Sequence, residues 1–216
     1  MLELPSVIRV VIMLHTMPSD IRSLDVRSWI LVLLLILPYP GLSAERGDIA
    51  PTFILPLIAN PPIDMQASQA EEPTDNGRRS PYQLLDLADY KGRVVYIDFW
   101  QTNCAPCRES LPQLSTIRDE FNREDVEILA VSTDTDPRDA LTFIEQHDIS
   151  IPVLSDPGAI VAGHYGTPAL PTAYIVDRAG YIASVKRGYT AGHAEGVRNE
   201  LRDLSSRPIA GKAIKN

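Results

Sequence analysis

The sequence predicts an α/β protein whose mixed central β-sheet is flanked by helices. Residues 94–100 form a mostly apolar and aromatic run, and residues 126–132 form a second mostly apolar one. Such runs are typical of strands that are buried on both faces of a sheet. Between them, apolar residues recur at helical spacing over 111–121. Strands that alternate with helices predict parallel pairing with right-handed crossovers, and a hairpin late in the chain makes the expected sheet mixed.

The composition limits the possible functions. The chain has 216 residues, enough for one sizeable core, with a formal net charge of −8 and only two cysteines. No stripe of Lys and Arg is present that could neutralise phosphates, so we expect no nucleic-acid partner. Two cysteines exclude a scaffold of several disulfides and a four-cysteine zinc site. We expect neither a cofactor nor a metal site.

Residues 1–44 predict a signal peptide or N-terminal anchor. Arg22 and Arg27 precede the apolar run 29–37, and the small-residue stretch 42–44 follows it. This is the order of a secretory signal, with cleavage expected after Ala44. The run is shorter than the roughly 20 residues that span a bilayer, although an uncleaved anchor and a buried helix stay open as alternatives. With a signal or an anchor, both cysteines lie in an exported, oxidising compartment.

The segment that follows predicts one strand and a polar interruption. Residues 50–55 favour a short edge strand after a proline, and residues 56–81 favour a loop insertion or a linker. We therefore divide the chain into 45–80, with the strand and the insertion, and a domain at 81–205. A short element is expected at 82–90.

The later elements begin at recognisable helix starts. Asp136 and Pro137 predict an N-cap and a first helical position, and Asp156 followed by Pro157 predicts a second, short helix. The first of these helices is expected to end near His147. The remaining predictions are an extended piece at 152–154, hairpin strands at 172–177 and 181–186, a last helix at 190–204, and a tail at 206–216.

Cys104 and Cys107 are the candidate catalytic residues. They follow a predicted strand and open a predicted helix, where the first N–H groups have no partners within the helix. These N–H groups and the helix dipole favour a thiolate at Cys104, which could attack a disulfide of a substrate. Cys107, one turn further, could then resolve the mixed disulfide. The alternatives are an inert structural disulfide and half of a metal site.

Asp98 is the third candidate catalytic residue. It stands inside an apolar strand six residues before Cys104. Burial of a carboxylate is costly, so we expect a raised pKa for Asp98 and a proton shuttle to Cys107. The alternative is a strand residue that faces water.

Leu170, Pro171 and Trp100 are the candidate substrate-binding residues. Proline tolerates a cis bond, and a cis bond before Pro171 would present the backbone of Leu170 to an extended substrate. Pro168 is the competing candidate for the cis bond, and an ordinary strand-start proline is the alternative. Trp100 is expected to pack beneath the sulfurs rather than to react.

Other residues near the predicted site have simpler interpretations. Arg108 is expected on an exposed helix face, as a solvated charge. Three histidines stand at apparent helix ends or turns, where capping or surface roles are more common than metal ligation. These histidines are His147, His164 and His193.

Several segments together resemble the thioredoxin superfamily, and within it the exported TlpA/ResA-like thiol–disulfide oxidoreductases. The resembling segments are the opening strand at 50–55, the core strand at 91–100, the cysteine segment at 104–108 followed by Pro112, the proline segment at 165–172 and the strand at 175–177. The resemblance covers residues 47–205 and implies a thioredoxin-like three-layer sandwich. Two departures are Asn103, where the family usually has Trp, and the apparent insertion at 57–80.

The resemblance implies a monomeric dithiol protein in the bacterial periplasm, soluble or tethered by its N-terminal segment. Such proteins are often kept reduced by a membrane electron donor. They reduce disulfides of selected protein clients through mixed disulfides, for example in apocytochrome c before haem attachment. We expect net reduction of the clients.

Two other functions stay open at this point. A related copper-chaperone type of module could bind copper(I) through two thiolates, but it requires a third ligand near the proline segment. No His or Met lies between Pro171 and Gly192, which argues against it. A thiol peroxidase-like enzyme would place Thr three residues before the reactive cysteine, where this chain has Gln101.

Overall fold

The structure is a computed structural model that describes residues 43–62, 83–190 and 192–208. All described residues belong to one compact unit. Residues 1–42 of the predicted signal or anchor at 1–44, most of the predicted insertion and the end of the tail lie outside the described residues. Within the described part, no helix combines the length and the apolar character needed to cross a membrane.

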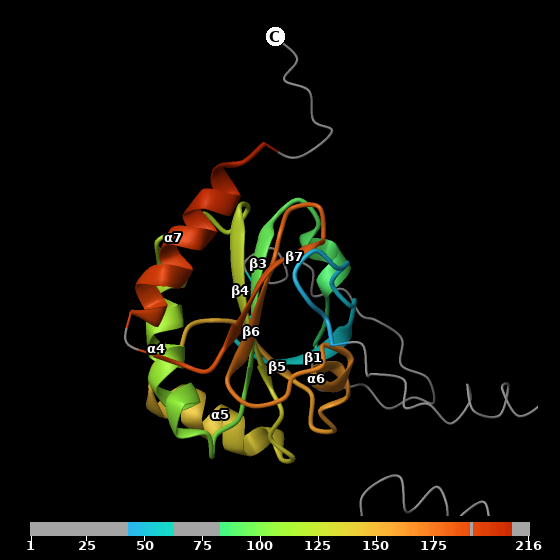
Figure 1. Ribbon diagram of the computed structural model, residues 1–216. Helices are drawn as coiled ribbons and strands as arrows, with labels where there is room; N and C mark the ends of the chain where they lie inside the picture. Colours follow the sequence, from blue (N-terminus) through green and yellow to red (C-terminus); the bar gives the residue numbers. More distant parts are fainter. Residues whose placement is uncertain (1–42, 63–82, 191, 209–216) are drawn as a thin grey trace, which may run out of the picture. The chain divides into compact units, whose positions relative to one another are not determined.

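A seven-stranded mixed sheet forms the centre of the fold, in the order β2-β1-β5-β4-β3-β6-β7 (Figure 1). β3 pairs in parallel with β4, and β4 with β5, whereas the other pairs are antiparallel. The strands are β1 (Ile54–Ala59), β2 (Gln83–Asp86), β3 (Val94–Trp100), β4 (Val126–Ser132), β5 (Val153–Ser155), β6 (Thr172–Val176) and β7 (Ile182–Arg187). The helices are η3 (Leu87–Tyr90), α4 (Ala105–Asp119), α5 (Pro137–Gln146), α6 (Ile160–His164) and α7 (His193–Ser206).

The helices cover the two faces of the sheet in separate layers. Apolar residues of α4, α5 and α7 pack on one face, together with Tyr96 and Trp100 of β3. The other face packs against α6 and the segment before β1, together with Ile97 and Phe99. Figure 1 shows α4, α5 and α7 on one side of the sheet and α6 on the other. The predicted α/β class and the predicted mixed sheet between helical layers are confirmed.

The first strand differs from its prediction. An edge strand was expected at 50–55, but β1 spans Ile54–Ala59 and lies inside the sheet, between β2 and β5. The start of the expected insertion therefore belongs to the strand. Asn60, just beyond β1, donates through Nδ2 to the carbonyl oxygens of Ile149 and Ile151 at 2.7 and 3.0 Å. Pairing with β2 and β5 explains the difference, because it gives backbone partners to residues on both sides of Pro56, where the sequence suggested that the strand ends.

Residues before the expected start of the fold at 47 already belong to it. Ala44 is buried, and its N–H donates to the carbonyl oxygen of Tyr165 at 3.1 Å. Glu45 pairs with Arg187 at 2.8 Å. The segment ahead of β1 is thus part of the same core as α6.

α5 begins where the sequence predicts, whereas α6 and α7 begin later in the chain than predicted. The Asp136 carboxylate accepts from the N–H of Arg138, as expected of an N-cap. α6 begins at Ile160 rather than at residue 157, because the Asp156 carboxylate accepts from the N–H groups of Ile160 and Ala162, both at 3.0 Å. α7 begins at His193 rather than at residue 190.

A buried ion pair joins α4 to β4. Arg118 Nη2 donates to Glu127 Oε2 at 3.0 Å, and Arg118 Nη1 donates to the carbonyl oxygen of Ser150 at 2.9 Å. Glu127 is fully buried, and it also accepts from the N–H of Ile128. Its removal therefore leaves a buried cation without its counter-charge.

We expect Glu127→Ala to lower the free energy of unfolding by about 3–5 kcal/mol, the usual cost of breaking a buried pair. The matched control is Asp119→Ala, which removes the largely exposed partner of Arg123 and should cost less than about 1 kcal/mol. Urea unfolding of both variants measures the difference. Equal losses in the two variants would contradict this account of the pair.

Candidate active site

The candidate site forms where β3 ends and α4 begins. Cys104 is the N-cap of α4 and has an extended backbone, so its side chain stands at the open end of the helix. Its Sγ is bonded to Cys107 Sγ at 2.05 Å, with 5.3 Å between the Cα atoms. The N–H of Cys107 also donates to Cys104 Sγ at 3.3 Å. This donor and the helix dipole stabilise negative charge on Cys104 when the disulfide is reduced.

The two sulfur-bearing residues differ in exposure. Cys104 is partly exposed, whereas Cys107 is fully buried in the core between α4 and the sheet. The next turn of the helix is held by Ser110, whose Oγ donates to the carbonyl oxygen of Cys107 at 3.0 Å. A molecule from solvent can therefore reach Cys104 but not Cys107. The two sequence-predicted cysteines are brought together as expected.

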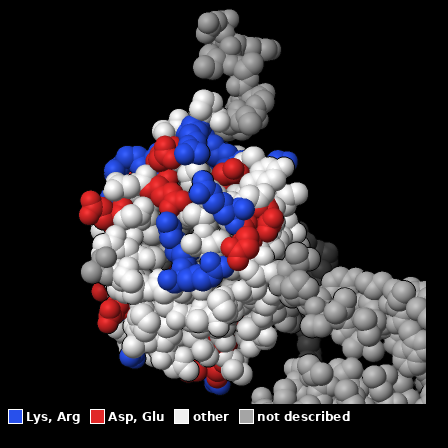
Figure 2. All heavy atoms as spheres, viewed as in Figure 1, with Lys and Arg blue, Asp and Glu red and all other residues white. Residues whose placement is uncertain are grey.

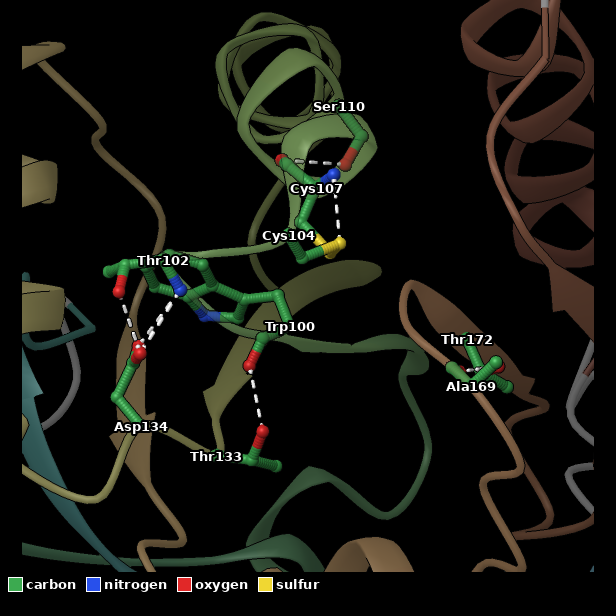
Figure 3. Close-up of a disulfide and its surroundings, with 9 residues drawn as sticks. All are labelled: Trp100, Thr102, Cys104, Cys107, Ser110, Thr133, Asp134, Ala169 and Thr172. Carbon is green, nitrogen blue, oxygen red and sulfur yellow. Dashed lines mark hydrogen bonds between the residues drawn. A yellow bond between two sulfur atoms is a disulfide. The ribbon is translucent and has the colours of Figure 1, made fainter.

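Asp134 holds the loop that precedes Cys104. Its carboxylate accepts from Thr102 Oγ1 at 2.7 Å and from the N–H of Thr102 at 3.1 Å (Figure 3). It also accepts from Ser132 Oγ at 2.9 Å. Beside it, the N–H and Oγ1 of Thr133 donate to the carbonyl oxygen of Trp100 at 2.9 and 3.2 Å. The end of β3 is thus bound to the end of β4, which fixes where α4 starts.

Asp134 was not among the residues predicted from the sequence. It is buried, and its hydrogen bonds to Thr102 position the loop before Cys104. A signal was available, because Asp134 directly follows a buried strand. Side chains at the carboxyl ends of adjacent parallel strands meet at one edge of a sheet.

Asp98 lies on the same face of β3 as Trp100 and Tyr96, the face that α4 covers. Alternation along the strand places these three residues on that face, toward the core that contains Cys107. Asp98 is 2% exposed, and burial raises the pKa of its carboxyl to about 8. Its Oδ2 has no hydrogen-bond partner among the described residues. The predicted burial and raised pKa are confirmed, and the alternative of a water-facing residue is wrong.

The Leu170–Pro171 peptide bond is cis, as predicted. The competing bond before Pro168 is not among the cis bonds of the described residues. Pairing of Thr172 with Phe99 sets this segment beside the end of β3, and Leu170 packs against both halves of the core. In Figure 3 the loop that carries Ala169 faces the disulfide across the site. Leu170 is partly exposed, so its backbone is within reach of a substrate at Cys104.

Trp100 was predicted among the substrate-binding residues, but its position in the structure does not suit that role. Its side chain is fully buried, and its ring packs against Phe143 with 5.6 Å between ring centroids. Figure 3 shows the indole next to Cys104. Burial leaves no surface of Trp100 for a substrate, so its position is that of a support beneath the sulfurs, the packing role that its sequence position also predicted.

Arg108 and the three histidines lie outside the group formed by the cysteines and Asp98. Arg108 is exposed on α4. His147 ends α5, with Nδ1 2.9 Å from the carbonyl oxygen of Phe143, and His164 and His193 lie at the ends of α6 and α7. Within the described ranges, no group of three or more His, Cys, Asp or Glu could hold a metal ion.

Comparison with known proteins now places the chain. Residues 47–185 match the model of the AhpC/TSA family. The chain belongs to the AhpC/TSA family. The match covers the strands from β1 to most of β7 and includes both cysteines, Asp98 and the cis-proline segment.

Relatives of this AhpC/TSA chain include thiol–disulfide oxidoreductases named ResA. The protein from Bacillus thuringiensis subsp. konkukian is 29% identical over 126 residues, or 55% of this chain and 73% of the relative. The one from Oceanobacillus iheyensis is 30% identical over 139 residues, or 64% and 69%. The predicted relation to the ResA-like oxidoreductases is confirmed, and with the Cys104–Cys107 pair these relatives support thiol–disulfide oxidoreductase activity.

Solved structures agree with this placement. A putative thiol:disulfide interchange protein DsbE from Chlorobium tepidum has a TM-score of 0.61 and 26% identity, and the match covers 76% of this chain and 99% of that protein. StoA from Bacillus subtilis has a TM-score of 0.51 at 18% identity, which shows the fold alone. The thioredoxin-like fold that the resemblance implied is confirmed.

The raised pKa of Asp98 predicts a particular dependence of stability on pH. Between its ordinary pKa of 3.8 and the folded value of about 8, the folded chain keeps the proton and the unfolded chain loses it. The free energy of unfolding therefore falls as pH rises through this window, by at most about 1.4 kcal/mol per pH unit from this group. Asp98→Asn removes that contribution.

Urea unfolding of wild type and Asp98→Asn at a series of pH values tests this. The variant should gain stability relative to wild type as pH rises from 3.8 to about 8, with no further gain above. Parallel curves for the two proteins would show that Asp98 is not buried as a neutral acid.

The hydrogen bonds between Asp134 and Thr102 predict that substitutions of these two residues have coupled effects on the free energy of unfolding. Asp134→Ala leaves buried donors without a partner and should cost about 1–3 kcal/mol, while Thr102→Val removes one of the same hydrogen bonds. The double variant should therefore lose less than the sum of the single losses. Denaturant unfolding of the oxidised wild type, the two single variants and the double variant measures the coupling. Additive losses of stability would show that Asp134 does not position Thr102.

Proposed function

We propose that this protein reduces disulfides of protein clients in an exported compartment, through the dithiol of Cys104 and Cys107. The observation that carries the proposal is the unequal exposure of the two cysteines at the start of α4. Cys104 is open to a client, and Cys107 is enclosed where only Cys104 can meet it. A pair arranged in this way separates attack from resolution.

The reaction begins with the reduced dithiol. The Cys104 thiolate attacks one client sulfur, forming a Cys104–client disulfide, and the other client sulfur leaves and takes a proton from solvent. Cys107 then gives its proton to the Asp98 carboxylate and attacks Cys104 Sγ, which releases the first client sulfur as a thiolate. The client gains two electrons, and the protein ends with the Cys104–Cys107 disulfide. A pKa of about 8 suits Asp98 to both taking and giving this proton near neutral pH.

The surroundings of Cys104 suit a polypeptide client. Partly exposed Leu170, next to the cis bond, offers backbone groups that can pair with an extended chain. Most of the exposed neighbours are uncharged, and Arg108 is the exposed charge in the first turn of α4. The uncharged neighbours are Asn103, Ala105, Pro106, Pro168 and Ala169. Such a largely uncharged rim leaves recognition mainly to backbone pairing and apolar contact.

The compartment and the reductant belong to the same proposal. The signal-like order of residues 1–44 supports export to a bacterial periplasm, either as a soluble protein or with the N-terminal segment as a tether. In an oxidising compartment the reduced dithiol needs an electron source, for which we propose a membrane donor. Haem attachment to cytochrome c is one process that consumes such reducing equivalents.

The alternative functions have less support. Copper(I) binding by two thiolates would call for a third soft ligand, and the described residues provide no such cluster. A peroxidase-like mechanism would require Thr at position 101, where the chain has Gln101.

A Cys107→Ser variant tests the proposal by capturing clients. Without the resolving thiol, the Cys104–client disulfide persists, so client adducts should accumulate in the exported fraction of cells. Non-reducing electrophoresis followed by mass spectrometry identifies them.

Cys104→Ser is the matched control and should capture nothing, because Cys107 is buried. A small disulfide probe confirms that Cys104 of the Cys107→Ser variant is reactive. Reaction with this probe together with an absence of protein adducts would overturn the protein-client proposal.

A further inference from the structure

The first described residues lie against the loop that carries Leu170. We name residues 43–45 the N-terminal clip and residues 166–171 the client loop. The N–H of Ala44 donates to the carbonyl oxygen of Tyr165, directly before the client loop, at 3.1 Å. Ala44 is 7% exposed, so this hydrogen bond lies inside the fold. The N-terminal clip is therefore docked where the client loop begins.

The client loop begins with a glycine, which lets the N-terminal clip approach closely. A Cβ on Gly166 would stand 2.4 Å from Cα of Ser43, closer than two carbon atoms can pack. Gly166 also has a φ of +67°, a conformation that glycine adopts without steric cost. Glycine at this position thus permits the contact between two backbones, at the point where the N-terminal clip meets the client loop.

Glu45 extends the N-terminal clip toward the other end of the client loop. Its Oε1 accepts from Arg187 Nη2 at 2.8 Å, and Arg187 is the last residue of β7. The N–H of the following Gly188 donates to the carbonyl oxygen of Pro171 at 2.8 Å. Ser43 Oγ also donates to Glu45 Oε1 at 2.8 Å, which orients the carboxylate. The N-terminal clip is therefore connected to both ends of the client loop.

We propose that the N-terminal clip positions the client loop for an extended client, and that the working protein therefore retains Ser43 and Ala44. The proposal deepens the proposed function and rests on it, because pairing of the client loop with a client belongs to that function. Ser43, Ala44 and Glu45 are positioning residues that act through residues 165–166 and 187–188. They take no part in the exchange at the sulfurs.

Backbone pairing between Leu170 and a client requires an accurately placed loop. Hydrogen bonds weaken when donor and acceptor depart from about 2.7–3.2 Å. Pro168 and Ala169 of the client loop are exposed, and in Figure 3 this loop faces the disulfide across the site. Thr172 Oγ1 holds the middle of the loop by donating to the carbonyl oxygen of Ala169 at 2.6 Å. The N-terminal clip holds its start, so a displacement there would shift the residues that pair with a client.

The N-terminal clip also bears on the fate of the segment before it. The predicted signal cleavage after Ala44 would remove Ser43 and Ala44. With them the chain would lose the contact at Gly166 and the hydrogen bond to Tyr165. Retention of both residues requires either an uncleaved anchor or a cut closer to the N-terminus. In either form, whatever precedes Ser43 joins the domain next to the client loop.

Ala44→Pro tests the proposal because proline lacks the N–H that donates to Tyr165. The carbonyl oxygen of Tyr165 keeps a partner, since the hydroxyl of Tyr174 donates to it at 2.7 Å. The reduced full-length variant is reacted with two probes. One is a synthetic peptide with a disulfide in an extended, uncharged segment, and the other is 2-hydroxyethyl disulfide, which has no backbone to pair.

We expect Ala44→Pro to lower the second-order rate constant for the peptide about three- to tenfold, the usual size of an effect from one lost hydrogen bond. The rate constant for 2-hydroxyethyl disulfide should stay at the wild-type value, because Cys104 itself is unchanged. Glu45→Gln, which keeps the size of the side chain, carries the test if Ala44→Pro does not fold. It should lower the peptide rate constant about twofold, since exposed ion pairs are weak.

Ala50→Pro is the matched control. Ala50 is 5% exposed, also precedes β1, and donates its N–H to the carbonyl oxygen of Gly180, between β6 and β7, at 2.9 Å. The substitution removes the same kind of hydrogen bond away from the client loop, so both rate constants should match those of wild type. An equal loss toward both probes in Ala44→Pro, or the same selective loss in Ala50→Pro, would contradict positioning by the N-terminal clip.

The mass of the intact exported protein tests the retention of the N-terminal clip. We expect the mature chain to include Ser43 and Ala44, and a mature chain that begins at Glu45 would overturn the proposal. The two probes also separate this proposal from the proposed function. Wild type that reacts with 2-hydroxyethyl disulfide but not with the peptide would refute the protein-client function, whereas wild-type peptide rates in Ala44→Pro and Glu45→Gln would refute the N-terminal clip alone.

Discussion

Strand β3 pairs with β4 on one side and with β6 on the other, and this double pairing determines where the reactive groups meet. The pairing with β4 brings Asp134 to Thr102 and so fixes the start of α4. The pairing with β6 brings the cis-proline segment to the same edge of the sheet. Cys104 emerges between these two contacts. The site therefore depends on one strand whose residues are all buried, and a change of register there would move every reactive group at once.

The same burial creates the chemical properties of the site. Alternation along β3 directs Asp98 and Tyr96 into the layer beneath α4, where water does not solvate a carboxylate. The pKa of Asp98 rises for this reason, and burial is its dominant cause. Burial of Asp98 lowers the free energy of unfolding at neutral pH. The same burial places a proton acceptor in the core that contains the Cys107 sulfur. Replacement of Asp98 by an apolar residue would remove both effects together.

Much of this arrangement could be predicted from local sequence. The apolar runs of β3 and β4 and the cysteine spacing are strong signals, because they concern neighbouring residues. Asp98 stood out as a charge inside an apolar run. The features that sequence analysis missed depend on distant contacts: Asp134 meets Thr102 across 32 positions, and Glu45 meets Arg187 across 142. The position of β1 was misjudged for the same reason, since its pairing with β5 is not visible in its own composition.

The local distribution of charge affects the site more than the net charge of the chain does. Figure 2 shows that charged side chains of both signs gather over one part of the visible face, while another part of that face carries few. Several charges of the described residues are paired, as in Lys186–Glu200 on β7 and α7 and Arg198–Glu120 between α7 and the end of α4. Exposed ion pairs are screened over roughly 8 Å at physiological ionic strength, so the net charge of −8 acts only weakly at a distance. Around Cys104, where Arg108 is the exposed charge in the first turn of α4, the thiolate responds mainly to the start of this helix and to the N–H of Cys107. The reactivity of the site is thus governed by local dipoles and burial rather than by the overall acidity of the protein.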